Sequence, residues 1–131
     1  MLVRVGYVSH PLIPPDGAEM GAIRRAAGRN NPVAGLTGAL YFDGEVFFQV
    51  LEGEAAAVGE MLGRVRRDPR HREMRIVERS GAAERLFAEA PMKFVDGRDW
   101  AAARQHRVGY GRLCAMAAEE RAPLLAALAR A

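Results

Sequence analysis

The stretch Asn30–Gly53, NNPVAGLTGALYFDGEVFFQVLEG, decides the fold. Apolar residues alternate on both sides of Asp43-Gly44, which predicts two antiparallel strands joined by a two-residue turn, because Asp-Gly readily adopts the positive φ angles of such a turn. In the second strand the two-residue period places Gln49 between large apolar neighbours on one face. A primary amide buried there without a partner costs about 1–3 kcal/mol. Gln49 is therefore expected to meet another protein polar group or a bound polar ligand.

Length and composition indicate one domain. The chain has 131 residues, half of them apolar, which is enough to bury a core. The single Cys114 excludes an internal disulfide framework and a cysteine-based zinc site. No apolar run reaches the roughly 18 residues of a membrane helix, and the N-terminus MLVRVGYVS alternates like a strand rather than a signal peptide. We therefore expect a cytoplasmic protein with no membrane contact.

The net charge is +3, and nearly all the positive charge is arginine, because Lys93 is the only lysine. Arginine suits carboxylate or phosphate groups, so an anion-bearing ligand is worth considering. A simpler interpretation of Arg64, Arg66 and Arg67 is that they occupy the last turn of a helix, where the helix dipole favours cations. Glutamates interrupt any continuous basic stripe, so nucleic-acid binding is not expected.

The segments before the hairpin predict a strand and a helix. Val3–Ser9 alternates and places Tyr7 on an apolar face, as a neighbour of the Gln49 strand. Asp16 followed by Glu19 has the form of an N-cap with a capping box. The apolar stripe of this helix stops at Gly28, which predicts a helix of about three turns.

After the hairpin, apolar residues at helical spacing predict a helix that ends at Asp68-Pro69. Two short strands follow, around Met74–Val77 and Met92–Val95, and the alanine-rich tail predicts two short helices. The resulting order, βαββαβ with an extra strand, predicts an α+β, ferredoxin-like fold with a mixed five-stranded sheet. Two helices would cover one face of the sheet, and the short C-terminal helices the other. Residues 1–95 would form the core, and residues 96–131 a helical extension of the same domain.

Polar residues on these elements suggest a binding site. Tyr7 and Gln49 would meet inside the core, where a purely structural hydrogen bond is one explanation. Asn31 lies at the expected end of the first helix, at the mouth of the space between helices and sheet. Asn30 could serve equally well as a helix cap, so two adjacent amides are more than a cap needs. The three histidines lack the spacing of a metal site, and no catalytic constellation stands out, so neither a metal nor an enzyme is expected.

These residues resemble those of the BLUF domain, a blue-light sensor that uses flavin. The resemblance covers about residues 2–95 and rests on YVS in the first strand, RNNPVAGLTGAL, FFQVLEGE, RRDPRH, and RLF followed by the segment with Met92. It implies a ferredoxin-like fold with an isoalloxazine ring between the two helices. The implied cofactor is FAD, with FMN or riboflavin as alternatives.

The resemblance also implies roles for individual residues. Tyr7 matches the redox-active tyrosine, Gln49 the switching glutamine and Met92 the methionine near it. Asn31 matches the asparagine that binds the flavin edge, and Asn30 its neighbour. The residues that would sandwich the ring or approach the ribityl and phosphate end are Ile23, Val65, Arg64, Asp68, Arg70 and His71.

The implied activity is a photocycle in which light rearranges the Gln49 amide and produces a small red shift. The signal would pass through the last strand and the C-terminal helices to a separate effector protein or through a homo-oligomer. Two positions depart from the family pattern. Ala90 stands where a tryptophan is frequent, which suggests altered coupling to the output surface, and Ala27 replaces a frequent serine.

Other classes of protein share this order of elements. An RNA-recognition module is consistent with the pI of 9.6 and with Phe47-Phe48, but Gln49 stands where a base would stack. A small acyl-phosphate hydrolase would need an arginine where this chain has His10-Pro11. A flavin-free relative that acts only as an interaction module would lack the yellow colour of a flavoprotein.

Overall fold

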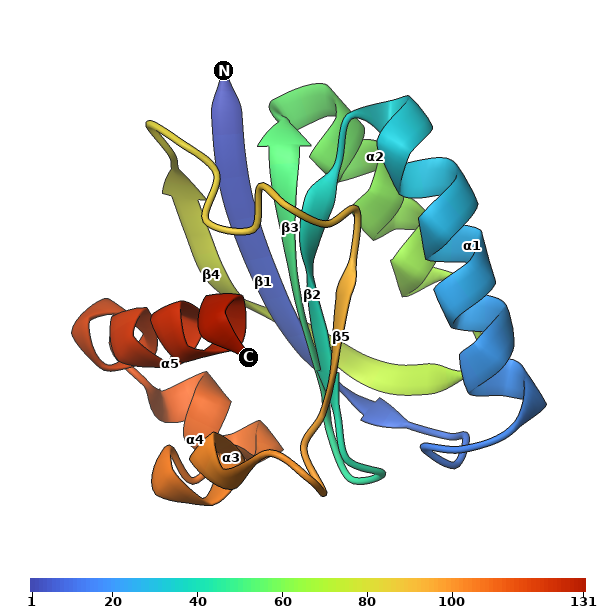
Figure 1. Cartoon of the computed structure of the whole chain (residues 1–131), viewed down its shortest axis with the longest axis vertical. Helices are drawn as coiled ribbons and strands as arrows, with labels where there is room; N and C mark the ends of the chain where they lie inside the picture. The colour runs from blue at the N-terminus through green and yellow to red at the C-terminus, as the bar shows by residue number, and fades with distance from the viewer.

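A five-stranded sheet lies between two layers of helices in the computed structural model, which describes residues 1–131 (Figure 1). The strands are β1 (Leu2–Pro11), β2 (Thr37–Phe42), β3 (Phe47–Glu54), β4 (His71–Gly81) and β5 (Lys93–Asp96). The helices are α1 (Ala18–Ala34), α2 (Ala55–Arg66), α3 (Ala101–Gln105), α4 (Tyr110–Ala115) and α5 (Ala118–Arg130).

The strand order is β4-β1-β3-β2-β5. The first four strands pair antiparallel, and β5 is added parallel to β2. This is the ferredoxin-like order with one extra strand, so the predicted fold class is confirmed. Helices α1 and α2 cover one face, while α3, α4 and α5 lie on the other (Figure 1). The tail thus forms three short helices rather than the two that were predicted.

The connection between β2 and β3 is longer than the predicted two-residue turn. Pairing ends at Phe42 and Phe47, which leaves a four-residue loop between them. The Asp43 carboxylate accepts hydrogen bonds from the backbone amides of Glu45 and Val46, at 2.9 and 3.0 Å. The side chain therefore takes the place of further ladder bonds, because an aspartate at a turn competes with the backbone for these amides.

The end of α1 also differs from the prediction, because the helix continues past Gly28 to Ala34. It stops at Gly35, whose φ of 71° is the left-handed conformation that glycine adopts easily. The Leu36 amide donates to the Asn31 carbonyl, and the Gly35 amide donates to the Pro32 carbonyl. These two bonds form a Schellman motif, which caps the helix almost two turns beyond Gly28.

The predicted capping box at Asp16 is wrong. The N-cap position is Gly17, and no side chain caps the helix there. Asp16 instead forms a two-pronged ion pair with Arg98, at 2.9 and 3.0 Å. A planar guanidinium matches both carboxylate oxygens, and this contact draws the aspartate away from the helix.

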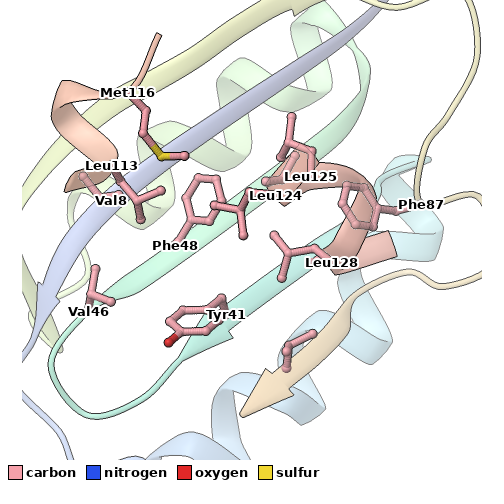
Figure 2. Packing of buried hydrophobic residues seen from close by; sticks show 13 residues of the cluster. Val8, Tyr41, Val46, Phe48, Phe87, Leu113, Met116, Leu124, Leu125 and Leu128 are labelled. Atoms are coloured by element: carbon pink, nitrogen blue, oxygen red, sulfur yellow. The ribbon is translucent and has the colours of Figure 1, made fainter. Parts of the chain in front are cut away.

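Alternation along the strands creates two hydrophobic cores. Val5, Tyr7 and Leu51 point toward α1 and α2. Residues of the opposite face, with Val8 and Phe48 among them, pack against α4 and α5 (Figure 2). Both sheet faces are therefore covered, and the aromatic side chains of β1 and β3 are buried, so these strands offer RNA bases no surface on which to stack.

The last two strands are displaced from their predicted bounds. β4 runs for 11 residues, well beyond Met74–Val77 at both ends. β5 begins at Lys93, so Met92 lies immediately before the strand and not in it. No helix is both long enough and apolar enough to span a membrane.

Candidate functional site

A cavity of about 250 Å³ opens between α1, α2 and the sheet. This is slightly below the roughly 300–1,000 Å³ of typical small-molecule sites, so it suits part of a ligand whose remainder stays outside. All the expected site residues except Met92 line it. They are Tyr7, Ile23, Asn30, Asn31, Gln49, Arg64, Val65, Asp68, Arg70 and His71.

The walls of the cavity are mainly apolar. α1 contributes Ile23 on one side, and α2 contributes Val65 on the other. Ala27, which stands in place of a serine frequent at that position, also lines the cavity. Four lining residues were not singled out from the sequence as ligand contacts: Ala26, Leu40, Phe47 and Met61. Their helical or strand periodicity marked several of them as core, and periodicity does not distinguish a packed core from a cavity wall. Such a slot fits a flat heterocycle.

A hydrogen-bonded pair lies at the base of the slot. Tyr7 and Gln49 are direct partners in the β1–β3 register, and the Tyr7 hydroxyl donates to Gln49 Oε1 at 2.5 Å. Tyr7 is 4% exposed, and its burial, together with the nearby Asp68 charge, raises its pKa well above the ordinary value. The phenol therefore remains protonated and acts as the donor.

The other end of the Gln49 amide points to Met92. Gln49 Nε2 donates to Met92 Sδ at 3.7 Å. Thioether sulfur is a weak acceptor, and the second amide hydrogen has no protein partner. Met92 therefore contacts the glutamine without lining the cavity, and the half-buried amide retains capacity to bind a polar ligand edge.

The extension of α1 places Asn31 in the wall of the cavity. Asn31 is 2% exposed, and its Nδ2 donates to the Pro91 carbonyl at 2.9 Å. Its side-chain oxygen has no protein partner, so it can accept a hydrogen bond from a ligand. Asn30 also lines the cavity and belongs to the helix rather than to a terminating loop.

Polar side chains form one end of the cavity. Arg70 donates to both oxygens of Asp68, at 2.7 and 2.9 Å, which lowers the pKa of that carboxyl. His71 Nε2 lies 2.6 Å from the Val65 carbonyl, and its Nδ1 lies 2.7 Å from the Ser9 hydroxyl. A carbonyl can only accept, so Nε2 carries a proton and donates to Val65, while Nδ1 pairs with the Ser9 hydroxyl.

Arg64 lies at the rim, where its side chain is 57% exposed and approaches Glu60 at 3.5 Å. An exposed pair of this kind contributes little to stability, so Arg64 is free to reorient toward an anion. The arrangement as a whole is an apolar slot, with amides at its edge and cations at its mouth. It suits a flat heterocycle that carries an anionic tail.

The chain belongs to the BLUF family, whose sequence model, described as sensors of blue-light using FAD, matches residues 2–93. The photoactivated adenylate cyclase subunit beta of Euglena gracilis is 34% identical over 86 residues, which are 66% of this chain and 10% of that protein. The chain thus spans about a tenth of the length of the curated relatives it matches.

Solved structures show the same relationship. The dark-state structure of the BLUF protein BlrB is 28% identical and has a TM-score of 0.86, with 98% of this chain and 96% of that chain covered. Klebsiella pneumoniae BlrP1 with FMN and cyclic diGMP is 33% identical and has a TM-score of 0.70, with 78% of this chain and 27% of that chain covered. The protein is therefore a BLUF-type blue-light photoreceptor domain that binds flavin.

Proposed function

We propose that Tyr7 and Gln49 are the photoactive pair of this domain and that the flavin ring occupies the slot between Ile23 and Val65. The observation that carries the proposal is the hydrogen bond from a buried phenol to an amide in the wall of an apolar cavity. Asn31 would accept from the ring edge with its unpartnered oxygen. Ala26 and Ala27 add small side chains to the α1 wall, which leaves room for a ring.

The chemistry follows from the order of the contacts. When bound, the flavin supplies absorption of blue light and an excited state that accepts an electron. Tyr7 is placed to give up that electron, and its proton can move along the 2.5 Å hydrogen bond to Gln49 Oε1. Gln49 then rearranges by rotation or tautomerism, which exchanges donor and acceptor toward Tyr7 and Met92 without moving the backbone.

The cofactor is proposed to be FAD, with FMN as the nearest alternative. A polar hollow adjoins the mouth of the slot and is lined by Glu19, Arg64, Arg67, Asp68, Pro69 and Arg70. Arg70 is paired with Asp68, which leaves Arg64 and Arg67 to meet a phosphate-bearing tail, a group that guanidinium recognises better than the neutral tail of riboflavin. Riboflavin should therefore bind more weakly than either phosphorylated form.

The output is proposed to run through β5 to the C-terminal helices. Lys93 follows Met92 directly, and its Nζ donates to the Ala129 carbonyl in the last turn of α5, at 2.7 Å. A shift of Met92 would therefore reach α5 through the adjoining Lys93 and its hydrogen bond to Ala129. The recipient is proposed to be a separate effector protein or a second copy of the chain, and no catalytic activity is assigned to the domain.

The test is spectroscopic. Protein saturated with FAD should be yellow, and blue light should produce a red shift that reverses in the dark. Failure to bind any flavin, or a spectrum that light does not change, would refute the proposal. An unchanged spectrum in a Gln49→Leu variant that still binds flavin is the expected negative control.

A further inference from the structure

Glu52 is a buried carboxylate on the sheet face opposite the flavin slot. It follows Gln49 by three positions on β3, so the two side chains point to opposite faces. Glu52 is 0% exposed. Its oxygens accept four hydrogen bonds, from Arg4 Nε at 2.9 Å, Thr37 Oγ1 at 3.2 Å, the Leu86 amide at 2.7 Å and the Phe87 amide at 2.9 Å.

Two of these donors belong to the segment between β4 and β5. Residues 82–92 have no helix or strand of their own, so their buried amides need other partners. A carboxylate that accepts from adjacent backbone amides forms charge-assisted bonds, which are stronger than neutral ones. A buried charge would be costly without this set of partners. Glu52 and the segment therefore hold each other in place.

Arg85 ties the same segment down a second time. One Arg85 nitrogen donates to Thr37 Oγ1 at 2.8 Å and to the Glu52 carbonyl at 3.2 Å. The other donates to the Gly35 carbonyl at 2.8 Å, at the capped end of α1. The start of the segment is thereby fixed to β2, β3 and α1 together.

The far end of the segment enters the flavin site. The Ala90 amide reaches back to the Phe87 carbonyl at 3.5 Å, so only a short turn separates the Glu52 contacts from Pro91. The Pro91 carbonyl accepts from Asn31, and the sulfur of Met92 accepts from Gln49. The end of this turn determines where Pro91 and Met92 lie. The start of the turn is held in place by the Glu52 carboxylate.

We propose that Glu52 is a positioning residue for the photocycle. It holds residues 84–92 so that the Pro91 carbonyl and the Met92 sulfur stay against Asn31 and Gln49, and it thereby sets the lifetime of the lit state. This inference rests on the proposed function. Without the carboxylate the segment loosens, the Gln49 amide rotates back more easily, and dark recovery becomes faster.

The test compares Glu52→Gln with Glu78→Gln in the FAD-loaded chain. An amide at position 52 must turn its NH₂ group toward at least one existing donor, so it cannot reproduce the four contacts. The Glu78 side chain is 12% exposed, pairs with Arg121 at 2.7 Å and accepts its other hydrogen bond from Ser80, with none from the segment, which makes it a matched control. Glu52→Gln should still show the red shift but recover roughly tenfold faster than wild type, whereas Glu78→Gln should recover at the wild-type rate.

If Glu52 only stabilises the fold, Glu52→Gln and Glu78→Gln should both unfold at a lower midpoint, and both should keep the wild-type rate of dark recovery. That result would overturn the inference. Adding Glu52→Gln to Met92→Leu should change recovery less than about twofold, because coupled residues are not additive. Full additivity would also overturn it.

If Glu52→Gln does not fold, Arg85→Met serves as the test instead, because it removes the second set of hydrogen bonds to the segment and should likewise accelerate dark recovery. A wild type without photochemistry would instead refute the proposed function.

Discussion

Removing the side-chain amide of Gln49 tests the central contact of the site in two independent ways. In Gln49→Leu the buried Tyr7 hydroxyl loses the acceptor that lies 2.5 Å away. A buried donor left without a partner costs about 1–3 kcal/mol. Tyr7→Phe should cost less, about 0.5–1.5 kcal/mol, because Gln49 is only half-buried and keeps its contact with Met92.

The double variant, with Phe at position 7 and Leu at position 49, should be less destabilised than the sum of the single variants. It leaves no polar group stranded, and replacing both partners with apolar groups is nearly neutral. The coupling free energy, which is the sum of the two single costs less the near-zero cost of the double variant, should be at least about 1.5 kcal/mol, measured by urea unfolding of all four proteins after removal of flavin. Additivity within about 0.3–0.5 kcal/mol would show that the two side chains do not interact.

The same variants separate binding from switching when flavin is present. Gln49→Leu should retain FAD, because the slot and the Asn31 amide remain, but it should give no red shift. A normal shift in this variant would refute the switching role. Tyr7→Phe should lose the product that forms by electron donation, and normal product formation there would remove Tyr7 from the mechanism.

Three further changes probe the surroundings of the site. Asn31→Ala removes an amide from the slot wall, so FAD should bind at least several-fold more weakly in equilibrium dialysis; an unchanged affinity would contradict the ring-edge contact. Lys93→Met breaks the bond to Ala129, so amide exchange should accelerate in the last turn of α5 but not in α2. Because the Arg70 contact lowers the pKa of Asp68, the stability that this carboxylate contributes is present above its unfolded pKa of about 3.9 and is lost as pH falls through the folded value. Asp68→Asn should therefore flatten the acid side of a stability-against-pH curve, and an unchanged curve would contradict this.

Local pattern in the sequence was sufficient for the parts of the molecule that repeat every two or every 3.6 residues. The strand period places Tyr7 with Val5 and Gln49 with Leu51, because successive side chains in a strand must alternate, and the structure shows that α1 and α2 cover this face. The ferredoxin-like arrangement followed from the element order, since few topologies satisfy the rules for connections, whereas the place of the extra strand beside β2 came from the structure. The expected cavity residues were named from the BLUF resemblance, and the fold brings all of them except Met92 to one cavity.

Only the tertiary structure decided where elements end and what buried charges contact. α1 continues through Asn31 because the capping amides of Gly35 and Leu36 are in place beyond it. Asp16 does not cap the first helix as predicted, because it pairs with Arg98, which lies 82 positions away in the sequence. In the sequence, Glu52 is one polar residue among others in a strand. Only the structure shows that it accepts hydrogen bonds from the distant Leu86 and Phe87 amides. Helix ends and buried carboxylates depend on partners from elsewhere in the chain, and no local window of sequence contains those partners.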